Sequence, residues 1–189
     1  MINSVLGHFL DRPLLPMAKR IRVNPNLLTI TGFIITLAAA FVLPLNLRIG
    51  GLLILAGCLF DTLDGAVART NKKTTKFGAF LDSLLDRVSD VLIFLSIAWH
   101  LAENGDKVGA LLSLGTMVGA FLVSYARARS EGLGIDNREG LMERPERIIL
   151  IIVGTLTGWL KLILWLMVML TYFTVLQRSY KVWKIDKTV

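Results

Sequence analysis

Long apolar stretches separated by short polar segments are the feature that most restricts how this sequence can fold. A helix of about 20 apolar residues crosses the hydrocarbon core of a bilayer. Six stretches approach this length, at residues 27–45, 49–68, 77–101, 108–126, 147–159 and 160–175. We therefore predict an all-α integral membrane protein with six transmembrane helices, of which the fifth is short for a span.

The distribution of basic residues predicts the orientation of these helices. The chain has 189 residues, of which 54% are apolar, and 17 of its 21 Lys and Arg lie at the termini or in the second-to-third and fourth-to-fifth connections. Only three lie in the opposite connections. By the positive-inside rule, both termini are cytoplasmic. Topology and attraction to anionic lipids also account for the net charge of +7, so no nucleic-acid partner is predicted.

The first 22 residues mix apolar and basic positions in the manner of a helix that lies in the cytoplasmic interface. Pro13 and Pro16 divide this segment into short turns. Pro25 then ends it, because the residue before a proline is disfavoured in a helix. We accordingly predict an interfacial amphipathic segment at 1–22 and a six-helix transmembrane domain at 23–189.

Aspartates gather where the second and third predicted helices meet the cytoplasm. A charged residue at membrane depth costs about 2.5–3.5 kcal/mol on insertion scales, so it usually faces a cavity, a partner or an ion. Asp61 and Asp64 are three residues apart, and Asp82 and Asp86 are four apart, so each pair shares one helix face. Since the two helices are antiparallel across a short loop, we expect the pairs to face one another.

Four carboxylates in one small space require counter-charge. Oxygen ligands without His or Cys suit Mg²⁺, Mn²⁺ or Ca²⁺, and a pair of such ions can clamp a pyrophosphate and orient an attacking oxygen. Two alternatives are a structural network with local Arg and Lys, and a divalent-cation transporter. The cytoplasmic location argues against transport, because transport sites favour the membrane midplane.

The stretch from Asp61 to Asp86 resembles the signature of the CDP-alcohol phosphotransferase family. In that signature, D-x-x-D-G-x-x-A-R is followed after eight residues by G-x-x-x-D-x-x-x-D. All eight fixed positions are present, as Asp61, Asp64, Gly65, Ala68, Arg69, Gly78, Asp82 and Asp86. The resemblance implies a phospholipid-synthesising transferase in which an acceptor hydroxyl attacks the lipid-side phosphorus of a CDP-lipid and CMP leaves.

The resemblance also implies roles for individual residues. Asp61, Asp64 and Asp82 would ligate one Mg²⁺ or Mn²⁺ ion, with Asp82 and Asp86 near a second, and Asp86 would be the general base. The implied contacts to the CDP-lipid are Asn26, Thr29, Gly65, Ala68, Arg69, Thr75 and Gly78. The glycines would leave the backbone open to a bulky ligand. Since the family is commonly dimeric, a homodimer is expected.

A second basic region indicates the acceptor. Residues 125–134 and 143–147 look like the branch that makes phosphatidyl- or archaetidylinositol phosphate from inositol phosphate, with CDP-diacylglycerol or CDP-archaeol as donor. An acceptor that carries its own phosphate needs fixed cations. The candidates are Arg127, Arg129, Arg144, Arg147 and Arg178. Two alternatives remain: these arginines only enforce topology, or the acceptor is glycerol 3-phosphate.

Overall fold

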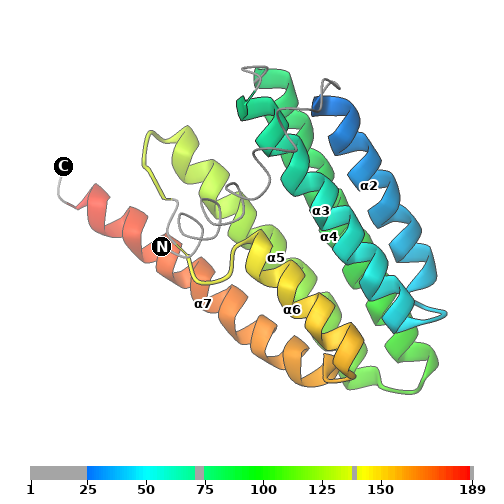
Figure 1. Ribbon diagram of the computed structural model, residues 1–189. Helices are drawn as coiled ribbons and strands as arrows, with labels where there is room; N and C mark the ends of the chain where they lie inside the picture. Colours follow the sequence, from blue (N-terminus) through cyan, green and yellow to red (C-terminus); the bar gives the residue numbers. More distant parts are fainter. Residues whose placement is uncertain (1–24, 71–74, 138–139, 188–189) are drawn as a thin grey trace. The chain divides into compact units, whose positions relative to one another are not determined.

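The computed structural model describes residues 25–70, 75–137 and 140–187, and within these ranges it contains six helices and no strand. The helices are α2 (Pro25–Val42), α3 (Leu47–Thr70), α4 (Lys76–Glu103), α5 (Lys107–Gly132), α6 (Arg144–Thr157) and α7 (Leu160–Asp186) (Figure 1). Each predicted apolar stretch overlaps one of them, which confirms the all-α fold and the order of the helices. The predicted interfacial segment, 1–22, lies outside the described residues.

Three of the described helices are long and apolar enough to cross a membrane. They are α3 over Leu47–Val67, α5 and α7, whereas α2 is apolar but shorter over Asn26–Val42. The α6 helix has 14 residues, so its length of about 21 Å is less than a hydrocarbon core of about 30 Å. The α4 helix has 28 residues, and its first half carries the charged side chains of the predicted site.

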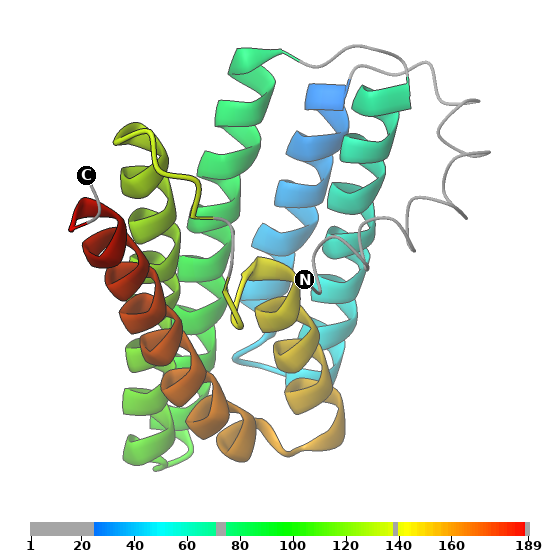
Figure 2. The same ribbon diagram turned by 90° about the vertical axis from the view of Figure 1, so that its left-hand side faces the viewer.

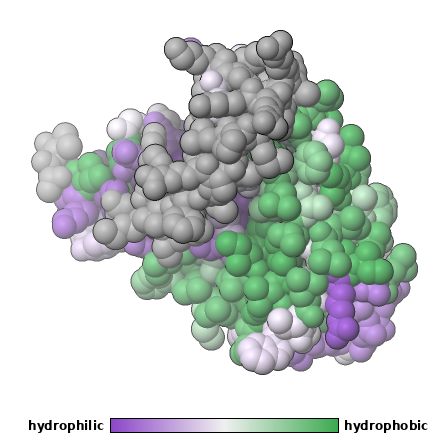
Figure 3. All heavy atoms as spheres, in the orientation of Figure 1, coloured by the Kyte–Doolittle hydropathy of each residue, from purple (hydrophilic) through white to green (hydrophobic). Residues whose placement is uncertain are grey.

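Large apolar side chains are exposed along these helices, among them Phe41, Leu52, Leu111, Leu162 and Leu176. Apolar residues cover much of the face drawn in Figure 3. Soluble monomers rarely expose apolar patches of such extent, so this surface is suited to contact with lipid. The membrane character that the sequence predicts is therefore visible in the folded chain.

The chain divides into two compact units, and the first ends at Ile93. In this unit α2 and α3 pack against each other (Figure 1). A Cβ atom added to Gly32 would lie 3.3 Å from the carbonyl oxygen of Gly57, so this pair of glycines lets the two backbones approach closely. Asn46 then fixes the start of α3, because its Oδ1 accepts from the N–H groups of Arg48 and Ile49 at 3.0 and 3.1 Å.

The second unit begins at Phe94, and in it α7 packs against both α5 and α6 (Figure 2). The α5–α7 contact depends on Gly119, since a Cβ there would collide with Thr171. Ser113 on α5 donates to the carbonyl oxygen of Phe94 at 2.7 Å and so links α5 to the second half of α4. The sequence leaves little room for a loop between α6 and α7, and Gly158 makes the short turn by adopting a positive φ of 83°.

Candidate active site

Three of the predicted metal ligands come together in the first unit. Asp61 on α3 and Asp82 and Asp86 on α4 each contribute one carboxylate oxygen, and these oxygens lie within 4.8 Å of one another. All three residues are partly buried. Three further predicted residues on this part of α3 have side chains that lie outside the described part of the structure, namely Asp64, Ala68 and Arg69. The expectation that carboxylates of two helices face each other thus holds for the described aspartates.

The donor set of this cluster fits a hard divalent cation. Its ligand atoms are carboxylate oxygens only, the type that Mg²⁺ and Mn²⁺ prefer. Asp61, Asp82 and Asp86 would hold such an ion, which would supply positive charge beside a bound diphosphate. Arg87 is an adjacent cation, with Nη1 at 3.3 Å from Oδ2 of Asp86.

The start of α4 carries several of the residues predicted to contact the CDP-lipid. Thr75 precedes the helix, and its Oγ1 accepts from the N–H of Gly78 at 2.9 Å, as a capping residue does. A Cβ atom at Gly78 would lie 2.9 Å from Oδ1 of Asn26 and 3.0 Å from Oγ1 of Thr75. Thr29 is buried one turn further along α2, and Gly65 is partly buried on α3. The structure therefore brings Asn26, Thr75 and Gly78 together. Because Gly78 has no side chain, Asn26 fits beside it.

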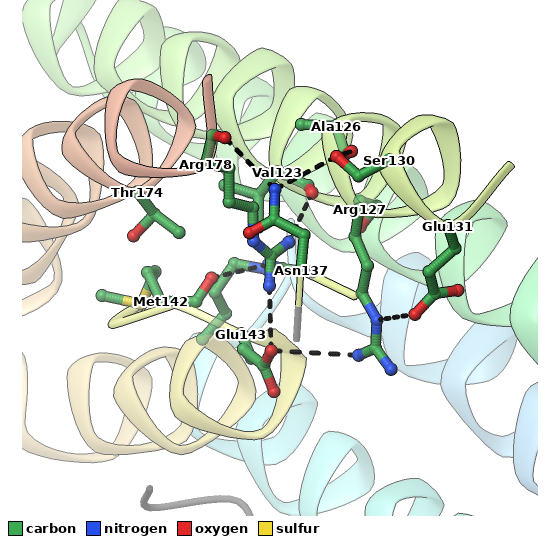
Figure 4. A network of polar contacts seen from close by, with 12 residues as sticks. Val123, Ala126, Arg127, Ser130, Glu131, Asn137, Met142, Glu143, Thr174 and Arg178 are labelled. Atoms are coloured by element: carbon green, nitrogen blue, oxygen red, sulfur yellow. Dashed lines mark hydrogen bonds and ion pairs between the residues drawn. The ribbon is translucent and has the colours of Figure 1, made fainter. Parts of the chain in front are cut away.

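A cluster of arginines and glutamates lies in the second unit (Figure 4). The guanidinium of Arg178 on α7 is buried, with Nη1 donating to the carbonyl oxygen of Val123 at 2.6 Å and Nη2 donating to Oε1 of Glu143 at 2.9 Å. The same Glu143 oxygen lies 3.8 Å from Nη1 of Arg127 on α5. Two of the predicted acceptor arginines, Arg127 and Arg178, therefore meet at one buried carboxylate.

The remaining predicted arginines occupy two helix ends. The α5 helix continues to Gly132, so Arg127 and Arg129 are both helical, and Arg129 is on the exposed surface. The α6 helix begins at Arg144 with Pro145 in its first turn, where the fixed φ of proline suits a helix start. Arg147 is buried there and donates to the carbonyl oxygen of Met142 at 3.1 Å. Among Arg129, Arg144 and Arg147, the side chain of Arg129 is the most accessible to a solute.

Residues 22–177 match the CDP-alcohol phosphatidyltransferase family. The chain belongs to this family. It is 40% identical to the archaetidylinositol phosphate synthase of Methanothermobacter thermautotrophicus over 97% of this chain and 95% of that protein. The family that the motif of Asp61 to Asp86 predicts is thereby confirmed.

Solved structures agree with this family assignment. The phosphatidylinositol phosphate synthase of Mycobacterium tuberculosis with CDP-DAG bound superimposes with a TM-score of 0.83 at 33% identity, over 91% of this chain and 94% of that one. The same synthase in complex with manganese and citrate also gives a TM-score of 0.83, at 32% identity, over 90% of this chain and 88% of that one. This CDP-alcohol phosphatidyltransferase therefore shares their fold over nearly all of its length.

Two residues of this CDP-alcohol phosphatidyltransferase, Glu143 and Asn137, were not predicted as part of a site. Nδ2 of buried Asn137 donates to Oγ of Ser130 at 3.1 Å and to the carbonyl oxygen of Arg178 at 3.2 Å. Glu143 directly precedes Arg144 and Pro145 at the start of α6, so its place beside a predicted phosphate-binding arginine was the available sequence signal. Its partner Arg178 is 35 residues away, and local sequence patterns do not identify such a partner.

Proposed function

We propose that this CDP-alcohol phosphatidyltransferase transfers a phosphatidyl or archaetidyl group from CDP-diacylglycerol or CDP-archaeol to a hydroxyl of inositol 1-phosphate and releases CMP. The observation that carries the proposal is the convergence of Asp61, Asp82 and Asp86 within 4.8 Å. The names of the similar synthases support the choice of acceptor. Glycerol 3-phosphate is the alternative acceptor, because it also carries a phosphate.

Asp61, Asp64, Asp82 and Asp86 would hold Mg²⁺ or Mn²⁺ in a two-metal site. The manganese complex of the similar mycobacterial synthase supports this choice of ions. Divalent cations neutralise charge on a diphosphate and acidify a nearby hydroxyl. The carboxylates of this chain supply the oxygen ligands and the negative charge that such ions need.

Asp86 is the proposed general base. In the transfer, the acceptor hydroxyl oxygen forms a bond to the lipid-side phosphorus, and the hydroxyl proton passes to the Asp86 carboxylate. The bond between that phosphorus and the bridging oxygen breaks, and CMP leaves with the electron pair. The residues proposed to bind the CDP-lipid are Asn26, Thr29, Gly65, Ala68, Arg69, Thr75 and Gly78, and the contact of Asn26 with Gly78 supports this grouping.

The acceptor phosphate is proposed to bind to arginines of the second unit. The candidates are Arg127, Arg129, Arg144, Arg147 and Arg178, and guanidinium groups suit a phosphate because their planar N–H donors match its oxygens. Arg127 and Arg178 already share a carboxylate oxygen of Glu143, which supports an anion site at this cluster. Among the candidates, Arg127 is partly exposed and Arg129 is exposed, so they are the most accessible to a soluble acceptor.

We further propose that the protein is embedded in the cell membrane as a homodimer, with six spans in the domain 23–189, an interfacial segment at 1–22, and both termini and the active site in the cytoplasm. Three of the described helices have the length and composition of spans, which supports the membrane location. The asymmetry of basic residues supports the orientation.

The proposal is tested by measuring CMP release from purified protein with one CDP-lipid and a panel of acceptors. The panel contains inositol phosphate, glycerol 3-phosphate, serine and free inositol. We expect metal-dependent release with inositol phosphate. Turnover with glycerol 3-phosphate alone would overturn the acceptor and leave the reaction class intact. Divalent-cation flux in proteoliposomes without CMP release would favour the transporter instead.

A further inference from the structure

Arg127 lies between two glutamates that differ sharply in their surroundings (Figure 4). Its Nε donates to Oε1 of Glu131 at 3.0 Å, and its Nη1 lies 3.8 Å from Oε1 of Glu143. The Glu131 side chain is 44% exposed, whereas that of Glu143 is only 7% exposed. An exposed pair at i, i+4 contributes little and exchanges with water. Glu143 is therefore the partner that can hold Arg127 in a fixed place.

Glu143 occupies the N-cap position of α6, yet its side chain does not cap the helix. Ser, Thr, Asp and Asn at this position commonly accept from the first free N–H groups, and a negative charge there is stabilised by the positive end of the helix dipole. The Glu143 carboxylate instead binds the guanidinium of Arg178. This carboxylate thus contacts arginines of α5 and α7 and does not cap its own helix.

Arg178 is in turn fixed from several sides. It donates to the carbonyl oxygen of Val123 and to Glu143, and its side chain is 1% exposed. The loop before α6 also approaches it closely, since a Cβ at Gly140 would lie 3.1 Å from Nη2 of Arg178. The Arg127 side chain, by contrast, is 37% exposed. Glu143 therefore connects the buried Arg178 of α7 to Arg127, which a solute can reach.

We propose that Glu143 is a positioning residue for the acceptor phosphate: its carboxylate, anchored on Arg178, holds the guanidinium of Arg127 where the phosphate binds. This inference rests on the proposed function. A long side chain that is held in place loses less conformational freedom when it binds, which strengthens binding. Glu143 carries one negative charge beside the two positive charges of Arg127 and Arg178, and the exposed pair of Arg127 with Glu131 can open to water and leave the Arg127 guanidinium to an anion.

The test compares Glu143→Gln with Glu131→Gln, a matched control that removes the exposed carboxylate from the same Arg127. The KM for inositol phosphate is measured at saturating CDP-lipid, together with kcat and the KM for CDP-lipid. We expect Glu143→Gln to raise the KM for inositol phosphate about tenfold, with kcat and the CDP-lipid KM nearly unchanged. Glu131→Gln should leave all three values within about twofold of wild type, as expected for an exposed pair.

A purely structural role would instead lower kcat and raise both KM values together, and that outcome overturns the inference. An unchanged or lowered KM for inositol phosphate in Glu143→Gln overturns it as well. Should this variant fail to fold, Glu143→Asp replaces it, because it keeps the charge but draws the carboxylate back by one methylene. The KM for inositol phosphate should again rise while kcat and the CDP-lipid KM stay nearly unchanged, and an unchanged KM for inositol phosphate overturns the inference. Failure of the proposed function is distinguishable, because the wild type itself would then release no CMP with inositol phosphate.

Discussion

The side chain of Asn26 at the start of α2 occupies the space that a side chain at position 78, at the start of α4, would need. A Cβ atom at Gly78 would come within 2.9 Å of Oδ1 of Asn26, closer than real Cβ atoms approach. Thr75 borders the same place and caps α4 through the N–H of Gly78. This contact joins two segments 52 positions apart that the family resemblance assigns to the same ligand, the CDP-lipid.

Gly78→Ala should therefore weaken binding of the CDP-lipid. The added methyl group displaces Asn26 or Thr75, and a small misplacement of binding groups is costly in rate. We expect the KM for CDP-lipid to rise about tenfold while the KM for the acceptor stays unchanged. The control is Gly132→Ala, because a Cβ at Gly132 meets no atom within 4 Å. Equal CDP-lipid KM values for the two variants would contradict the expectation.

Removal of divalent metal should abolish CMP release. Chelation with EDTA takes away the counter-charge of Asp61, Asp82 and Asp86, and added Mg²⁺ or Mn²⁺ should restore activity. Asp82→Asn should lower kcat at least about 100-fold at any metal concentration, because one ligand and one charge are lost. Asp186→Asn, an exposed position at the end of α7, is the control. Activity that survives chelation would exclude the proposed metal dependence.

Arg178→Lys should destabilise the fold although the charge is retained. A lysine cannot donate to both Val123 and Glu143 with the fork geometry of a guanidinium. The buried acceptor left without its donor costs about 1–3 kcal/mol. The measurement is the thermal unfolding temperature in detergent, with Arg129→Lys on the exposed surface as the control. An unchanged unfolding temperature for Arg178→Lys would show that the two contacts contribute nothing to stability.

The Asp106 carboxylate should make the free energy of unfolding depend on pH. Lys161, with Nζ at 2.8 Å, and the N–H of Gly109 hold the pKa of Asp106 below its ordinary value of 3.8. A depressed pKa in the folded state means that the stabilisation is complete above the unfolded pKa and is lost as the pH falls through the folded one. The wild-type protein should therefore lose the stabilisation from this ion pair in acid, below about pH 3.8.

Asp106→Asn isolates the ion pair, because asparagine is also a good N-cap residue. We expect this variant to unfold at a lower temperature than wild type at pH 7, and the difference to shrink at acidic pH. Asp106→Ala removes both the cap and the pair, so it should be less stable than Asp106→Asn at pH 7. A difference between wild type and Asp106→Asn that is independent of pH would rule out the charge as its cause.

The sequence predicts that the carboxylates of Asp61, Asp82 and Asp86 come together, because the key spacings lie within single helices. Asp82 and Asp86 are one helical turn apart, so they share a face in any α-helix. The start of α6 is similarly local, since Pro145 favours the first turn. The number of spans is less well determined, because length and composition qualify three of the described helices rather than the predicted six.

By itself, then, the sequence determined the helices, their order and the family, since these depend on local periodicity and on a motif of fixed spacing. Only the tertiary structure decided that Arg178 is buried against Glu143, 35 residues away, and against Val123, 55 residues away. It also separated Arg129, which is exposed, from Arg147, which is buried. The physical reason is that such pairs form where α5, α6 and α7 pack, and helical periodicity fixes the face of each helix without fixing which helix meets it.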